Sequence, residues 1–343
     1  MRNSIAIKGG SPSKERIWYW DSVKFFMMLF VVVGHFIEEM IVLGRMDLQV
    51  IKAFLYAFHM PLFIFIFGVF YKEKNSEKRA IFFLISGLIM KLLVHYSSLL
   101  MFEDVTFSLF YNAGITWFLF VLVWYIVLAK ALKKLDKRLV LVISFAISLF
   151  TGYFKEIDDF LCLSRMFVFF PYFWLGTMID RDTFPAKIRS VRKYLLIPAI
   201  CLLAAWLAIC LFGGERVESL IPLFTGRNSF FRETDGRGCL YRLLTTAITV
   251  ITGLSVLIIV PEKKVPVISY LGRNTINVYF WHYPFLYLIV YLMNVKDHVE
   301  NNAYLIALIL IGIALTFLLS LDIFNFPLKN LNKLIMNHKK TAD

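Results

Sequence analysis

The sequence predicts an all-α, polytopic membrane helix bundle with about ten transmembrane helices and both termini in the cytoplasm. Of its 343 residues, 59% are hydrophobic and only 18% are charged. Soluble domains are nearer half apolar and a quarter charged. The mean hydropathy is +0.70, and apolar runs long enough to cross a bilayer recur along the whole chain.

The predicted spans are apolar runs of about 20 residues. They cover residues 22–44, 50–71, 80–101, 113–132, 139–154, 161–180, 194–213, 240–260, 269–293 and 303–326. No cleavage pattern precedes the first run, so we expect it to be a retained span. We interpret residues 1–343 as one transmembrane domain without a fused soluble domain. Three segments lie outside the spans of this domain: a cytoplasmic leader (1–20), a long outer loop (214–239) and a cytoplasmic tail (327–343).

The distribution of basic residues gives the orientation. The termini and alternate loops hold 24 Lys and Arg residues, whereas the other set of loops holds 8. Loops rich in Lys and Arg stay in the cytoplasm, so both termini are predicted there. Acidic residues, including Glu103, Asp104, Glu156, Asp158 and Asp159, gather on the outer side. The net charge of +13 therefore indicates topology, and we expect no nucleic-acid partner.

The four cysteines indicate little about function. Cys162, Cys201, Cys210 and Cys239 show no CxxC spacing and no histidine partners, so no metal site is expected. Cys162 and Cys239 are both predicted near the outer surface. Either a disulfide between them or free thiols is compatible with the sequence, and free thiols are favoured.

The first predicted span contains KFFMMLFVVVGH, with Lys24 at the cytoplasmic edge and His35 eleven residues later. Eleven helical residues rise about 16 Å and make about three turns, so both side chains share one face near which Asp21 also lies. Ionisable residues inside a membrane are functional candidates. Alternatively, Lys24 extends to the headgroups and His35 makes a structural hydrogen bond.

The ninth span, in LGRNTINVYFWH, places Thr275, Tyr279 and His282 on one face and Arg273 at its cytoplasmic end. Two mid-membrane histidines on separate helices indicate a buried polar chamber, although either one is also compatible with a structural role. Weaker candidates, for either a ligand contact or a structural role, are Glu38, His59, Lys91, Trp117 and Arg165. The loop 214–239 mixes arginine, asparagine, aspartate and aromatic residues, so it is either a sugar-binding segment or a solvated connector.

Five motifs in order carry a resemblance to a known family. They are WYWDSVKFFMMLFVVVGHF, FHMPLFIFIFG, ITWFLFVL, SRMFVFFPYFWLG and LGRNTINVYFWH. With them the chain resembles the integral-membrane acyltransferase 3 family, and within it the fucose 4-O-acetylase-like and polysaccharide O-acetyltransferase branch. Three features depart from the family pattern. Lys24 stands where the family usually has arginine. The family often has two arginines three residues apart where the third helix begins. Here Lys78 and Arg79 are present, but Phe82 stands in the place of the second arginine. No esterase-like domain follows the spans, so we expect any such domain to be a separate protein.

The resemblance implies an O-acetyltransferase that moves an acyl group, usually acetyl, from cytoplasmic acyl-coenzyme A to a hydroxyl of a cell-surface or lipid-linked sugar. Acyl-coenzyme A is then a co-substrate, and no tightly bound cofactor is expected. Partners would be the sugar acceptor, the bilayer and separate glycan-assembly proteins, in the bacterial cytoplasmic membrane. Neutral histidine suits removal of a hydroxyl proton.

His35 is therefore the predicted base. Lys24 is predicted to hold the phosphates of the donor or polarise its thioester, with Lys78, Arg79 and Arg273 on the same side. The sugar would enter past Arg165 and the outer loop. Asp21, Glu38, His59, Lys91, Trp117, Thr275, Tyr279 and His282 are predicted to support the site.

Two other function classes stay open. A proton-coupled secondary transporter would also have about ten spans, mid-membrane histidines and a lysine inside the membrane. No paired helices broken by glycine or proline in matching halves support it. A membrane scaffold or sensor without chemistry is the third alternative.

Overall fold

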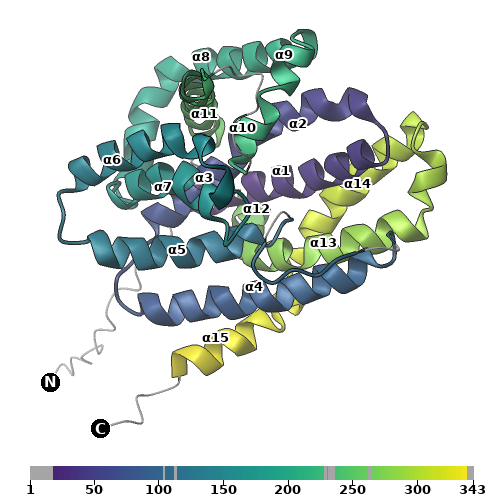
Figure 1. The fold of residues 1–343 in the computed structure, drawn as a ribbon, viewed down its shortest axis with the longest axis horizontal. Helices are drawn as coiled ribbons and strands as arrows, with labels where there is room; N and C mark the ends of the chain where they lie inside the picture. Colours follow the sequence, from purple (N-terminus) through teal and green to yellow (C-terminus); the bar gives the residue numbers. More distant parts are fainter. Residues whose placement is uncertain are drawn as a thin grey trace, which may run out of the picture.

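The computed structural model describes residues 18–102, 105–111, 114–227, 230, 236–261 and 265–337. Within these ranges the fold is a bundle of helices without a strand, and Tyr111 and Phe160 form one isolated β-bridge. The all-α prediction is therefore confirmed. Figure 1 shows α1 (Trp18–Val42) near the middle of the bundle, with α4 (Ser76–Ser98) along one edge and α8 (Phe184–Phe212) along the opposite edge.

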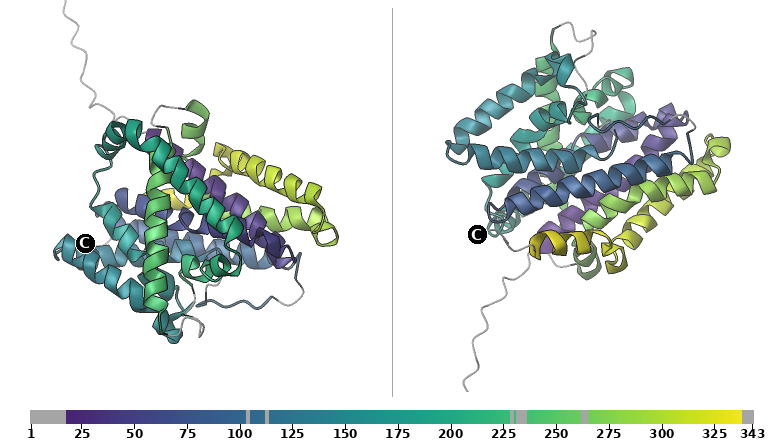
Figure 2. Two further views of the ribbon diagram at one scale, coloured as in Figure 1. Left: turned by 90° about the horizontal axis from the view of Figure 1, so that it is seen from above. Right: turned by 60° about the horizontal axis from the view of Figure 1, so that its bottom comes forward.

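The remaining helices follow in chain order. They are η1 (Met46–Leu48), α2 (Gln49–Tyr56), α3 (His59–Val69), α5 (Trp117–Leu132), α6 (Lys137–Phe150), η2 (Thr151–Tyr153), η3 (Lys155–Ile157), α7 (Leu163–Thr177), α9 (Glu215–Glu218), α10 (Ile221–Thr225), α11 (Gly238–Ile259), α12 (Pro266–Leu271), α13 (Thr275–Leu292), η5 (Val295–His298), α14 (Asn302–Leu319), η6 (Asp322–Asn325) and α15 (Leu328–Asn337). Figure 2 shows α8 and α11 side by side on the outside of the bundle.

Six helical segments among the described residues are long and apolar enough to cross a membrane. They are Trp18–Val42, Met46–Val69, Ser76–Ser98, Phe184–Phe212, Gly238–Ile259 and Asn302–Leu319, and Trp117–Leu132 is a shorter apolar helix. These helices support the prediction that the chain is a membrane protein. The count of ten spans and the cytoplasmic termini stay predictions.

The prediction of one continuous helix over 50–71 is wrong, because the helix breaks between α2 and α3. Pro61 follows the break and has no N–H to donate to the carbonyl of Ala57, four residues earlier. The hydroxyl of Thr249 on α11 donates to that carbonyl at 2.6 Å. A neighbouring helix thus satisfies the group that proline leaves without a donor.

Other predicted boundaries need correction. The segment 269–293 is two helices, α12 and α13, and α14 ends at Leu319 before the short η6. The predicted tail contains α15, and the predicted outer loop contains α9 and α10. The leader up to residue 17, the pair Glu103 and Asp104, and parts of the outer loop and tail lie outside the described residues. All four cysteines, including Cys162 and Cys239, are free thiols.

Two motif glycines let α3 and α7 pack at close range. A Cβ atom on Gly68 would overlap the carbonyl oxygen of Phe173, and one on Gly176 would overlap that of Phe65. Small residues of this kind allow helix backbones to approach one another in membrane bundles. Gly272 has the same function beside Asp21, where the turn after α12 meets the start of α1. These contacts fix the helices that carry the candidate site.

Candidate functional site

A cavity of about 390 Å³ with many polar lining residues lies inside the bundle, and we call it the His35 cavity. Residues from α1, α2, α3, α5, α7, α10 and α13 line it, together with residues that precede α5 and Arg227 after α10. Its charged or titratable lining side chains are His35, Glu38, Glu39, Lys52, His59, Tyr56, Arg165, Arg227, Tyr283 and Tyr287. Its size is in the range of ordinary ligand pockets.

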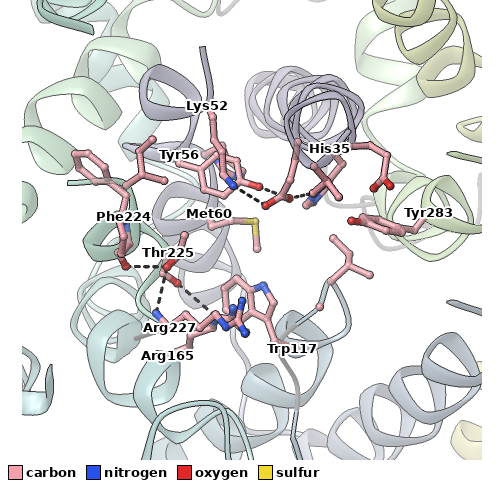
Figure 3. A pocket seen from close by; sticks show the side chains of 18 of the residues that line it. His35, Lys52, Tyr56, Met60, Trp117, Arg165, Phe224, Thr225, Arg227 and Tyr283 are labelled. Carbon is pink, nitrogen blue, oxygen red and sulfur yellow. Dashed lines mark hydrogen bonds and ion pairs between the residues drawn. The ribbon is translucent and has the colours of Figure 1, made fainter. Parts of the chain in front are cut away.

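Glu38 is the centre of the hydrogen-bond network at this cavity (Figure 3). Its Oε2 lies 3.1 Å from Nδ1 of His35 and accepts the hydroxyl of Tyr56 at 2.7 Å. Its Oε1 accepts Nζ of Lys52 at 2.7 Å. A carboxylate at Nδ1 orients the imidazole and leaves Nε2 as the atom that takes a proton. His35 and Glu38 therefore form a base–carboxylate pair on one face of α1.

The turn between α1 and α2 brings these partners together. Arg45 holds it through two bonds to Asp47, at 2.8 and 2.7 Å, so that α2 returns along α1. Lys52 and Tyr56 are four residues apart and share one helical face. That face meets Glu38, which is three residues after His35 on α1.

The opposite wall of the cavity is basic and aromatic (Figure 3). The guanidinium of Arg165 lies 4.8 Å from the ring of Trp117. Its Nη1 is 3.7 Å from Oδ1 of Asp159, and Nε of Arg227 donates to Oδ2 of the same carboxylate at 2.6 Å. One carboxylate is thus shared by two arginines that line the cavity.

The structure brings the two predicted mid-membrane histidines together. The ring centroids of His35 and His282 are 5.5 Å apart. His282 is fully buried, and its Nδ1 lies 3.0 and 2.9 Å from the carbonyl oxygens of Val278 and Tyr279. Its Nε2 has no hydrogen-bond partner among the described residues. His282 supports the ring of His35 from behind and does not line the cavity.

A second, mainly apolar cavity of about 300 Å³ lies further toward the start of α1, and we call it the Lys24 cavity. Lys24, Thr275 and Tyr279 line it together with aromatic and aliphatic side chains. Nζ of Lys24 is 2.8 Å from Oδ1 of Asp21. The predicted pair on α1 thus belongs to two different cavities.

Tyr279 separates these two cavities. It lines the Lys24 cavity, and its hydroxyl donates to the carbonyl of Ile115, which lines the His35 cavity. The ring of Tyr279 also packs against that of Phe118, with centroids 5.1 Å apart. This hydrogen bond and this aromatic contact therefore form part of the partition between the predicted donor and acceptor sides.

Besides Asp21 and His282, four predicted residues line neither cavity. Lys78 donates to the carbonyl of Met336 on α15, at 2.9 Å. Arg79 lies over the ring of Tyr71, and its Nε and Nη2 have no hydrogen-bond partner among the described residues. Arg273 is exposed, with its guanidinium 4.2 Å from the ring of Tyr270.

The fourth is Lys91, which finds its acceptors in the segment that follows α4. Its Nζ donates to the carbonyls of Tyr111, at 2.9 Å, and Leu109, at 3.3 Å. Both of these acceptors are backbone carbonyls.

Sequence reasoning missed several lining residues. Lys52 is one of them, and its spacing of four from Tyr56 could have placed both on the face of α2 that meets Glu38. Glu39 is buried, and its Oε1 has no hydrogen-bond partner among the described residues. Arg227 belongs to the outer loop 214–239, for which the sequence left open a sugar-binding segment or a solvated connector.

The comparisons with known proteins decide the family. A family model described as an acyltransferase domain, acyltransferase 3, matches residues 17–321. The chain belongs to the acyltransferase 3 family. No curated protein and no solved structure matched the chain in the same comparisons. The predicted family is confirmed, and the narrower branch stays a prediction.

As an acyltransferase 3 protein with several membrane-length helices, the chain is a membrane acyltransferase. The matched range begins one residue before α1 and ends after α14, so both cavities lie within it. An acyltransferase needs a group that activates the acceptor and a place for the acyl donor. The His35 and Lys24 cavities are the candidates for these two parts.

Proposed function

We propose that this acyltransferase moves an acyl group, most simply acetyl, from cytoplasmic acyl-coenzyme A to a hydroxyl of a cell-surface or lipid-linked sugar. The bacterial cytoplasmic membrane would be its location, and the fucose 4-O-acetylase-like branch its nearest group. The observation that carries the proposal is the His35–Glu38 pair at a polar cavity. Lys24, on the same helix α1, lines a second cavity on the other side of Tyr279.

The chemistry of the pair fits a hydroxyl acceptor. An alcohol is a weak nucleophile until a base removes its proton. Nε2 of His35 takes that proton as the oxygen attacks the thioester carbonyl. The carboxylate of Glu38, next to Nδ1, stabilises the imidazolium that forms. The coenzyme A thiolate leaves as the new ester forms, and the proton held by His35 returns to the thiolate.

The basic side of the protein suits the donor. Coenzyme A is anionic and soluble, so it approaches from the side where the predicted topology gathers Lys and Arg residues. Lys24 is positioned to meet the thioester arm, because it lines a cavity otherwise formed largely by aromatic and aliphatic side chains. Arg79 retains N–H donors that a phosphate oxygen could accept from.

Acyl-coenzyme A consumption tests the proposal directly. Membranes containing the full chain are expected to release free thiol from acetyl-coenzyme A and to esterify surface glycans, as detected by mass spectrometry. His35→Ala should lower turnover by about 10²–10⁴-fold, the usual contribution of a general base, while donor binding survives. His35→Gln should fail similarly, because glutamine forms hydrogen bonds but is not a base near neutral pH.

Near-normal turnover by His35→Gln would remove the base assignment from His35. Absence of any acyl-coenzyme A consumption by the wild-type protein would refute the proposed reaction itself. That second result would favour the transporter alternative, since proton-coupled transport also uses intramembrane histidines.

A further inference from the structure

The two walls of the His35 cavity carry opposite charge. Glu38 and Glu39 line the cavity from α1, the helix that carries His35. Arg165 and Arg227 lie on the other side, beside Trp117 (Figure 3). Lys52 offsets the charge of Glu38 through their ion pair at 2.7 Å. Glu39 has no such ion pair, and its Oε1 accepts no hydrogen bond among the described residues. The cavity is therefore electrically polarised from one wall to the other.

The arginine wall presents its positive charge to the cavity. Arg165 and Arg227 line the space, but the carboxylate they share, Asp159, lies outside the lining. The contact between Arg165 and Asp159 is an ion pair at 3.7 Å, too long for a hydrogen bond. The side chain of Arg165 is only 5% exposed. Its Nε also donates to the carbonyl of Thr225 at 3.4 Å. Because two guanidiniums share the single carboxylate of Asp159, this wall keeps an excess of positive charge that favours an anionic ligand.

The neighbouring carboxylate does not remove this preference. Burial, and then the charge of Asp159, raise the pKa of Asp158 above its ordinary value. Asp158 therefore offsets less of the arginine charge than an exposed aspartate would. It also lies outside the residues that line the cavity. The groups that a ligand meets on this wall are the two guanidiniums and the aromatic rings.

We propose that the acceptor sugar carries an anionic group, a carboxylate or a phosphate, which binds at Arg165 and Arg227 while its reacting hydroxyl lies at His35. This inference rests on the proposed function and specifies its acceptor class. Guanidinium forks match both anions through paired N–H···O bonds. The His35 wall offers no such pair of guanidiniums and carries two carboxylates, of which one is paired with Lys52, so the charges also set the direction in which the sugar binds.

A panel of small acceptors tests the inference. Methyl glycosides of glucose, galactose and mannose are compared in three forms: neutral, with a carboxylate at C6, and with a phosphate at C6. Binding to the purified full chain is measured by calorimetry, and transfer from acetyl-coenzyme A by mass spectrometry. We expect at least one acidic form to bind about tenfold more tightly than its neutral counterpart, which corresponds to about 1.4 kcal/mol. The preferred acid distinguishes a uronic acid from a phosphorylated sugar.

Matched variants assign the preference to the arginine wall. Arg227→Gln and Arg165→Gln should both bring the ratio of acidic to neutral binding toward one. Arg227 is the safer variant, because its side chain is 40% exposed and its replacement leaves the buried ion pair in place. Arg216→Gln is the control, since this exposed arginine on α9 lies outside the lining and should leave the ratio unchanged.

Three results would overturn the inference: neutral forms that bind as well as the acids, no binding of any acid, or an acid preference that persists in Arg227→Gln. Thiol release from acetyl-coenzyme A by native membranes separates the two levels of the argument. If thiol release is intact and the acid preference is absent, only the acceptor class is wrong. If thiol release is absent, the proposed reaction is wrong.

Discussion

Replacing Glu38 by glutamine tests whether this carboxylate acts through His35. The amide keeps the shape of the side chain but exchanges one accepting oxygen for a donating NH₂ group. If the NH₂ group takes the place of Oε1, Lys52 loses its acceptor at 2.7 Å. If it takes the place of Oε2, His35 and Tyr56 lose theirs, at 3.1 and 2.7 Å. The imidazolium that forms during proton transfer also loses its neighbouring negative charge.

The expected cost follows from these contacts. Hydrogen bonds to a charged group contribute about 1.5–3 kcal/mol each, and each 1.36 kcal/mol of barrier is tenfold in rate. Loss of one such bond from the transition state predicts that turnover by Glu38→Gln falls roughly 10–100-fold. The KM for acyl-coenzyme A should change little, because the donor side of the partition is not touched. Glu77→Gln, the same change at an exposed carboxylate of α4, is the matched control.

A double-mutant cycle with His35→Ala decides the interpretation. If Glu38 acts by orienting and stabilising His35, Glu38→Gln should cost almost nothing further in the His35→Ala background. Turnover is measured as thiol release from acetyl-coenzyme A in the presence of glycan acceptor, and thermal unfolding in detergent checks the fold. Costs that simply add, or a fall in unfolding temperature that accounts for the lost turnover, would refute the positioning role.

Three further changes test the donor side, the partition and the topology. Lys24→Ala should raise the KM for acyl-coenzyme A clearly while the unfolding temperature changes little. Lys24→Arg keeps the charge and should keep much of the activity. Normal donor kinetics in Lys24→Ala would mean that the lysine only extends to the headgroups. Tyr279→Phe removes the hydrogen bond to Ile115, about 1 kcal/mol, and should raise acceptor-independent thiol release about fivefold; an unchanged rate would contradict a partition at this residue. In a cysteine-free background, a membrane-impermeant thiol reagent should label Glu215→Cys but not Lys134→Cys from outside; labelling of both would contradict the predicted orientation.

The sequence predicted the helical class and the approximate positions of most helices, because apolar runs of membrane length are typical of helices that cross a bilayer. It did not predict the break between α2 and α3. Pro61 was visible, but a proline kink is stable only if another group satisfies the carbonyl it leaves without a donor. That group is Thr249, nearly two hundred residues later, and a single sequence does not reveal such a pairing.

The candidate site, like the fold, was predictable from the sequence only within single helices. The spacing of Lys24 and His35 predicted one face of one helix, since helical geometry fixes it within a single element. The partners of that face come from other elements. Lys52 reaches Glu38 only because the turn after α1 reverses the chain, and Arg227 reaches Asp159 from the outer loop. Local periodicity does not contain these long-range contacts.

Two histidines line the cavity and a third, His282, packs against His35; what each Nδ1 faces distinguishes their roles. Nδ1 of His59 lies 2.7 Å from the carbonyl of Leu55, across the break between α2 and α3. Nδ1 of His282 lies near two carbonyls of its own helix. A carbonyl accepts the ring proton and fixes the ring, but it brings no full charge to stabilise an imidazolium. Nδ1 of His35 faces the carboxylate of Glu38, which does both. Of the three, His35 is therefore built to take a proton, while His59 and His282 hold the backbone and rings around it.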